Sequence, residues 1–194
     1  MKAVIATVIS AMALTACASV QATTPLHEMA REDAPMWDMV SLQNLDEAFK
    51  ASFERKTMIV EFGGAPIPLE FEGVNFEEFK KVEASTRIYK RNDNVFISFD
   101  PSSCKAGIGV SYELVEEALE FKSFHQPGPA CSRMVRGKSG KQYNIPTHYL
   151  VQTKFMEIAP QVKWYDVSSD GNALTLLDSE NQELALFSLV EAAE

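Results

Sequence analysis

Hydrophobic and polar residues alternate with period two along most of the second half of the chain. Such alternation predicts strands that bury one face, and short polar turns between them predict antiparallel hairpins. One hairpin is predicted around the turn dipeptide Asn92-Asp93, and Glu116-Glu117 is expected to be a turn or a bulge between two further strands. The C-terminal part repeats the pattern, which predicts an antiparallel meander with strands in 162–168, 173–178 and 183–189.

Three other stretches have helical spacing, each with a polar residue placed to cap the first turn. The predicted helices and caps are 45–56 with Asn44, 75–82 with Asn75, and a helix within 147–162 with Thr147 as its cap. The last of these helices is expected to end before Pro160.

Residues 57–62, TMIVEF, are β-branched and aromatic and end at two glycines, which predicts one further strand. Strands outnumber helices, so the expected fold class is α+β: mainly an antiparallel β-sheet or small open barrel with a few covering helices. With 194 residues, 46% of them hydrophobic, the chain is long enough to bury one sizeable core.

The N-terminus is an apolar segment that ends on a cysteine. The run from Ala3 to Leu14 carries no charge, is too short to span a membrane, and is typical of a signal peptide. Leu14-Thr15-Ala16-Cys17 resembles the lipobox of bacterial lipoproteins, in which the cysteine carries the lipid after cleavage. The resemblance implies a signal peptide at 1–16, lipidation at Cys17, and a lipidated tether at 17–36 before a domain at 37–194.

Several acyl chains would hold the protein firmly, because each buried methylene contributes about 0.8 kcal/mol. Ser19, close after the cysteine, is not an aspartate, which resembles the pattern of lipoproteins sent on to the outer membrane. We therefore expect a lipid-anchored protein of the bacterial cell envelope, at the outer membrane and facing the periplasm. Inner-membrane retention, or an ordinary signal peptide that happens to precede a cysteine, are the alternatives.

Three cysteines leave an odd thiol in an oxidising compartment unless one of them is modified. With Cys17 acylated, Cys104 and Cys131 remain as a pair. A disulfide between them would close a loop of about 28 residues and stabilise the fold by about 3.5 kcal/mol, less any native strain. We predict this disulfide.

The charge balance argues against a nucleic-acid partner. The formal net charge is −9, and basic residues concentrate only in the short stretch 133–141, which is interpreted as a solvated loop.

Catalytic and metal chemistry find little support in the sequence. Cys131 with His125 or His148 as base lacks a flanking motif, and a zinc site built from these residues and Cys104 would need free thiolates and tighter spacing. No catalytic residue, metal ion or cofactor is therefore assigned.

Two weaker motifs have plain structural interpretations. Gly107-x-Gly109 lacks the third glycine of a nucleotide-binding loop, so it predicts a bulge in a strand. The acid pairs Glu77-Glu78 and Glu116-Glu117 are interpreted as solvated surface.

Trp164 and Tyr165 are neighbours on a predicted strand and should point to opposite sides of the sheet. We expect Trp164 in the core and Tyr165 exposed, as a candidate surface contact for a partner.

The order of motifs resembles the META domain, the HslJ-like family of lipoproteins and heat-shock proteins. SCKAGIGVSYEL and GPACSRM are similar to the two cysteine-containing elements of that family, and MWDMVSL resembles its first strand. Residues 43–92 have no counterpart and are expected to be an insertion or an added subdomain. The C-terminal hairpin pattern matches at Val162, Tyr165, Val167, Asp170-Gly171, Leu174, Leu176, Asp178, Leu184 and Phe187.

The resemblance implies a compact β-rich domain outside the inner membrane, linked to envelope stress, secretion or motility, without established catalytic residues. We therefore expect a non-enzymatic envelope protein that acts through protein-protein contacts in envelope maintenance or stress tolerance. The alternative is a small-ligand-binding lipoprotein with a cavity in the β-sheet domain.

Overall fold

The computed structural model describes residues 26, 28–59, 66–101, 107–125 and 133–190. Within them, eight strands form one sheet with the order β10-β11-β12-β1-β4-β5-β6-β7, and neighbouring strands are antiparallel. The expected α+β class, mainly antiparallel sheet with a few helices, is confirmed, and the sheet is open. The strands are β1 (Trp37–Leu42), β4 (Ala84–Arg91), β5 (Asn94–Pro101), β6 (Ile108–Val115), β7 (Ala118–His125), β10 (Trp164–Val167), β11 (Ala173–Leu177) and β12 (Glu183–Leu189).

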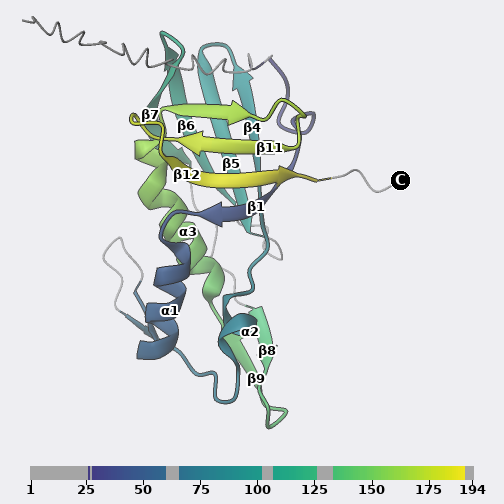
Figure 1. The fold of residues 1–194 in the computed structure, drawn as a ribbon, viewed down its shortest axis with the longest axis vertical. Coiled ribbons are helices and arrows are strands. Elements are labelled where there is room, and N and C mark those ends of the chain that lie inside the picture. The colour runs from purple at the N-terminus through teal and green to yellow at the C-terminus, as the bar shows by residue number, and fades with distance from the viewer. Residues whose placement is uncertain (1–25, 27, 60–65, 102–106, 126–132, 191–194) are drawn as a thin grey trace, which may run out of the picture.

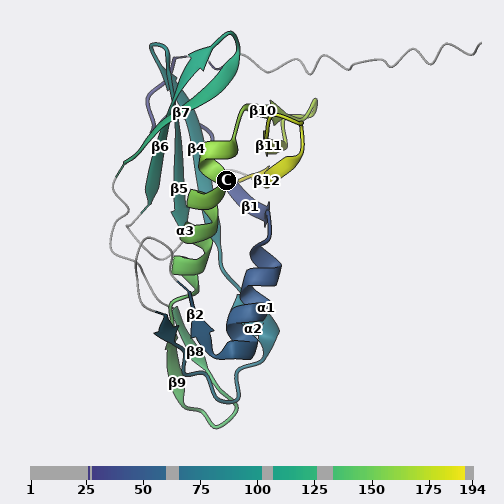
Figure 2. The ribbon, with the colours of Figure 1, turned by 90° about the vertical axis from the view of Figure 1, so that its left-hand side faces the viewer.

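The sheet bends so that its two halves face one another. β1, β11 and β12 cross the longer strands β4 to β7, and the core lies between the two sets (Figure 1, Figure 2). At the far edges, the Leu119 amide of β7 donates to the Lys163 carbonyl, 2.8 Å away, just before β10. Lys163 donates in turn to the Leu177 carbonyl of β11 at 2.8 Å. The sheet thus approaches a barrel at this point without closing.

Phe99 of β5 lies at the centre of the core. Its ring stacks on Phe155 at 4.3 Å and meets Phe187 of β12 edge-on at 6.4 Å, and all three rings are fully buried. Tyr112 of β6 is buried too, and its hydroxyl donates to the Ala159 carbonyl at 2.8 Å. Large side chains from both halves of the sheet and from a helix therefore fill the interior.

That helix is α3 (Thr147–Ile158), which lies against the inner face of β4 to β7 and continues into the 3-10 turn η1 (Ala159–Gln161) (Figure 2). Its α-helical part ends before Pro160, as predicted. The predicted cap is wrong: Pro146 occupies the N-cap position, and Thr147 is the first helical residue, fully buried against the core.

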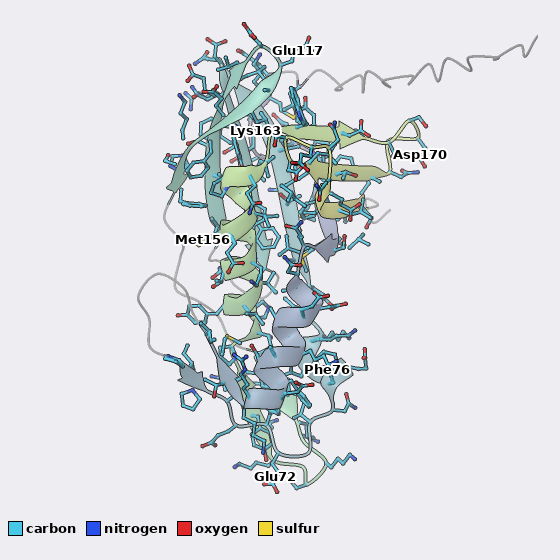
Figure 3. All side chains as sticks on the ribbon, turned by 60° about the vertical axis from the view of Figure 1, so that its left-hand side comes forward. Glu72, Phe76, Glu117, Met156, Lys163 and Asp170 are labelled. Atoms are coloured by element: carbon cyan, nitrogen blue, oxygen red, sulfur yellow. The ribbon has the colours of Figure 1, made fainter. Side chains whose placement is uncertain are left out.

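The lower end of the molecule carries the remaining elements: α1 (Leu45–Arg55), α2 (Phe76–Lys80), and two short strand pairs (Figure 1). Glu72 and Phe76 mark this end in Figure 3, and Glu117 marks the opposite one. Phe71 packs on Phe53 at 4.8 Å and on Phe79 at 5.0 Å, so this end has its own aromatic cluster. The strand pairs are β2 (Thr57–Met58) with β3 (Ile67–Pro68), and β8 (Arg133–Arg136) with β9 (Gln142–Ile145).

The predicted helix at 45–56 is confirmed, the one at 75–82 is confirmed only over Phe76–Lys80, and one of the two caps is confirmed. Asn75 accepts a hydrogen bond from the Glu78 amide at 2.8 Å. Asn44 has the left-handed φ of 59° and its side chain makes no capping bond. A two-residue link must turn the chain from β1 into α1 here, and asparagine tolerates the conformation that this turn needs.

Two other local predictions fare differently. Of the predicted strand at 57–62, Thr57 and Met58 form β2, and residues 60–62 lie outside the described residues. Of the basic stretch 133–141, which was interpreted as a loop, residues 133–136 form β8 and only 137–141 are the turn into β9; the buried Val135, Tyr143 and Ile145 anchor this hairpin.

Segments outside the META-like pattern belong to the sheet. β4 falls within 43–92 and pairs with both β1 and β5. The chain also contacts the sheet before Trp37: the Met29 amide donates to the Lys90 carbonyl at 3.4 Å, and Ala34 is buried. Among the described residues, no helix is long and apolar enough to cross a membrane.

Candidate functional site

The outer face of β4 to β7 carries the candidate site. α3 covers the inner face, where Ile88, Ile97 and Val110 are buried. Because side chains alternate along a strand, the residues directly before and after each of these three point to the opposite, outer face. A hollow of about 730 Å³ lies there, lined by residues of the four strands and by Arg31. We call it the outer hollow.

One wall of the outer hollow is a hydrogen-bonded triad of Arg31, Ser98 and Asp100. Arg31 Nη2 donates to Ser98 Oγ at 2.7 Å and to Asp100 Oδ2 at 2.9 Å, and Ser98 Oγ donates to the same Oδ2 at 2.8 Å. The Arg31 and Asp100 side chains are 46% and 33% exposed, so water screens the ion pair and it contributes about 1 kcal/mol or less. Its main effect is to hold donors and acceptors in place.

The other wall is a row of rings that crosses the strands. Tyr89 of β4 and Phe96 of β5 are cross-strand partners, and their rings stack at 5.3 Å with an angle of 15°. His125 of β7 follows at 5.9 Å from the Phe96 ring. Because Phe96 and Ser98 are successive residues on the same face of β5, the row of rings lies beside the polar triad within the hollow.

Gly107, just before β6, and Gly109 of β6 form the floor. A Cβ at Gly107 would lie 1.6 Å from Asp100 Oδ1, and one at Gly109 would lie 3.1 Å from His125 Cβ. The predicted bulge at these glycines is wrong, because Gly109 pairs regularly with Ser98 and His125, and the β6–β7 irregularity follows Ser111. The glycines instead allow Asp100 and His125 to lie over the strand.

The segment before β1 borders the outer hollow. Glu28 forms an isolated bridge with Lys90, and its Oε1 accepts a hydrogen bond from the Asn92 amide at 3.2 Å. A second hollow, of about 520 Å³, lies between residues 28–32 and residues 89–91. Part of the segment expected to be a tether therefore lies on the sheet and delivers Arg31 to the site.

The outer hollow combines aromatic rings with hydrogen-bonding side chains. Within the described part of the chain, no hydrogen bond joins His125 to Ser98 or Asp100, so a Ser-His-Asp set is not assembled. Those same residues also include no group of three or more His, Cys, Asp or Glu placed to hold a metal ion.

The cysteines that the sequence singled out, Cys17, Cys104 and Cys131, lie outside the described residues, so their lipidation and pairing stay predictions. The two candidate histidines lie on opposite sides of the sheet. His125 lines the outer hollow, whereas His148 is buried in α3 on the other side of the sheet.

The expectation for Tyr165 is wrong. Tyr165 is only 6% exposed and belongs to the core, while its neighbour Trp164 is half-buried. Tyr165 pairs with the buried Leu176 of β11, which fixes the inward side of β10. Burial raises the pKa of the Tyr165 hydroxyl, against a smaller opposing effect of a hydrogen bond from the Leu26 backbone.

The charged motifs have structural positions at the surface. Glu116 and Glu117 are exposed in the β6–β7 turn, as predicted, with φ of 49° and 74°. Glu78 accepts a bond from Arg133 Nη1 at 3.0 Å and ties α2 to β8. Lys141 of the basic stretch lies over the Tyr143 ring, 4.9 Å from its centre.

Sequence reasoning missed the triad and two of the three rings. The alternation in FISFD, residues 96–100, does place Phe96, Ser98 and Asp100 on one face, so that part of the signal was present. Arg31 gave none, since it precedes the predicted domain and meets Ser98 across 67 positions of the chain.

Comparison with known proteins identifies no relative of this chain. No protein-family model, curated protein or solved structure matches the chain. The site therefore rests on its own geometry, and the META-like resemblance remains an expectation from sequence.

Proposed function

We propose that this protein is a non-enzymatic, lipid-anchored protein of the bacterial cell envelope, with a META-like domain, that acts by reversible binding at the outer hollow. The observation that carries the proposal is that hydrogen-bonding side chains and aromatic rings lie together in one hollow. The Arg31, Ser98 and Asp100 triad lies beside the rings of Tyr89 and Phe96 on one face of the sheet, next to two glycines.

Such a combination of flat apolar surface and a few fixed polar groups is typical of ligand sites. The alternative expectation, a cavity inside the β-sheet domain, finds less support, because Phe99, Phe155 and Phe187 fill the space between the sheet halves. Binding on the outer face accommodates either a small ligand or the protein contact expected from the sequence. The lipid anchor, supported by the lipobox, would keep this face at the membrane surface.

Site-specific photo-crosslinking in the host envelope tests the proposal. A photo-reactive residue replaces Tyr89 in the full-length protein, and the matched control carries it at Val40 of β1, which is 59% exposed and lies away from the hollow. We expect an adduct at position 89, detected by intact mass, that is absent at position 40. Equal labelling at both positions, or none at 89, would contradict binding at the outer hollow.

A further inference from the structure

We propose that the outer hollow binds a neutral oligosaccharide, with a sugar ring lying against the Tyr89–Phe96 ring pair and its hydroxyl groups bonded to the triad. The inference rests on the proposed binding function and names the ligand class. Three independent properties of the hollow lead to it: its charge, the strand pairing that already uses the backbone hydrogen bonds beneath it, and the contrast between its rings and its polar groups.

The charge of the hollow disfavours ionic ligands of either sign. Arg31 and Asp100 neutralise each other at 2.9 Å, so neither offers an unpaired charge. In the neighbouring hollow Glu28 and Glu32 are balanced by Lys90 and Arg91, and the whole chain carries −9, which opposes phosphates and other anions. A cation would have to displace Arg31 from Asp100. A neutral ligand meets neither cost.

The backbone under the hollow is not available to a peptide. Residues 94–99 of β5 pair with β4 on one side and with β6 on the other. A peptide that binds by adding a strand needs a free sheet edge; the edge on this side of the sheet is β7, beyond His125, and not the backbone under Phe96 and the triad. Recognition must therefore go through side chains, from the rings and the triad.

The two walls match the two surfaces of a sugar ring. A pyranose presents C–H groups on its faces and hydroxyl groups, which both donate and accept hydrogen bonds, around its rim. Tyr89 and Phe96 stack on each other, and the ring surface that this pair leaves uncovered is the apolar contact; the triad offers an acceptor and donors held by mutual bonds. The volume of about 730 Å³ falls within the ordinary range of ligand sites, which is roughly 300–1,000 Å³.

Calorimetric titration of the full-length protein in detergent tests this ligand class. The probes are tetramers of N-acetylglucosamine, of β-1,4-linked glucose and of α-1,4-linked glucose, with inorganic phosphate as the anionic comparison. We expect at least one tetramer to bind and phosphate not to bind. Phe96→Ala and Asp100→Asn should each weaken that binding about tenfold, through loss of stacking and of a charged acceptor, while Val40→Ala leaves it unchanged.

Asp100→Asn keeps the shape of the side chain, so its effect stays interpretable if Phe96→Ala fails to fold. Absence of binding by all three tetramers at millimolar concentration overturns the inference, and so does binding that neither variant weakens or binding of phosphate alone. If crosslinking at position 89 captures a protein while no sugar binds, the ligand class is wrong and the proposed function stands. If position 89 captures nothing and no sugar binds, both fail.

Discussion

Gly107 shows how tightly single residues define the outer hollow. Because a Cβ there would lie 1.6 Å from Asp100 Oδ1, we expect Gly107→Ala to displace Asp100 and break its bonds to Arg31 and Ser98. The expected loss is about 1–2 kcal/mol in the free energy of unfolding, measured with urea.

The control is the same change in an Asp100→Ala background, where the clash with the carboxylate is gone. The cost there should fall by at least about 1 kcal/mol, as expected for contacting residues. An equal cost in both backgrounds would instead implicate the Phe99 carbonyl, which lies 3.1 Å from the same Cβ.

Tyr112 gives the fold a dependence on alkaline pH. Burial raises the pKa of its hydroxyl above the ordinary value of 10.0, so folding favours the neutral phenol. This contribution to stability is fully present below pH 10 and is lost as the pH rises above it, where the unfolded state ionises. Tyr112→Phe also removes the bond to the Ala159 carbonyl and should cost about 1 kcal/mol at pH 7.

Unfolding of both proteins between pH 8 and pH 11 measures this difference. We expect the advantage of the wild type over Tyr112→Phe to shrink above pH 10, because the variant has no phenol to ionise at this position. A difference that stays constant across this range would show that Tyr112 does not titrate on unfolding.

The residue scale also shows where alternation stops being informative. Opposite orientations for Trp164 and Tyr165 follow from period two alone, but which of them points inward does not. That choice depends on the bend of the sheet, which brings β10 toward Leu119 of β7 and turns Tyr165 toward the core. A bend of this kind depends on contacts between distant strands, which a local pattern does not contain.

At the scale of elements, the β6–β7 turn is strained. Glu116 and Glu117 both have positive φ, which is unfavourable for residues with a side chain, whereas asparagine and glycine are the residues that such two-residue turns prefer. We expect the double change Glu116→Asn with Glu117→Gly to raise the free energy of unfolding by about 1–2 kcal/mol.

The matched control is Glu116→Gln with Glu117→Gln, which removes the same charges and keeps the backbone strain. Urea unfolding of the two double variants separates the effects. Equal stabilisation by both would mean that charge, and not backbone conformation, limits this turn.

Elements built from neighbouring residues were predictable, and the site was not. The hairpin around Asn92 and the cap at Asn75 depend on contacts within a few residues, so their patterns are complete in the sequence. The triad joins residues 31, 98 and 100, and its first member lies in a segment whose composition resembles a tether. Long-range contacts of this kind carry no local signature.

At the scale of the whole molecule, the covalent state is the expectation that most affects function. Intact mass spectrometry of the protein extracted from its host membrane should show cleavage before Cys17, an acylated Cys17, and a mass lower by two hydrogens for the pair Cys104 and Cys131. Free thiols that alkylate in denatured, unreduced protein would contradict the disulfide. An unmodified Cys17 would remove the basis for the anchor.

The order of strands could not be foreseen either. Residues 43–92 had no place in the META-like pattern, yet β4 separates β1 from β5 and joins the two halves of the sheet. The strand order depends on which hydrophobic faces meet in three dimensions, and α3 and Phe99 decide this by filling the space between the halves.

The placement of Arg31 has a mechanical consequence. In a chain held at Cys17, as proposed, a pull between membrane and domain would act first on the short segment that contacts β4 through Met29 and the hollow through Arg31. A pull from the N-terminal side would load those few bonds before it reached β1, which is paired with β12 on one side and with β4 on the other. Tension would therefore detach Arg31 from the hollow before it disrupted the pairing of any strand. The hollow would then keep Arg31 when the anchor and the domain are close together and lose it when they are pulled apart.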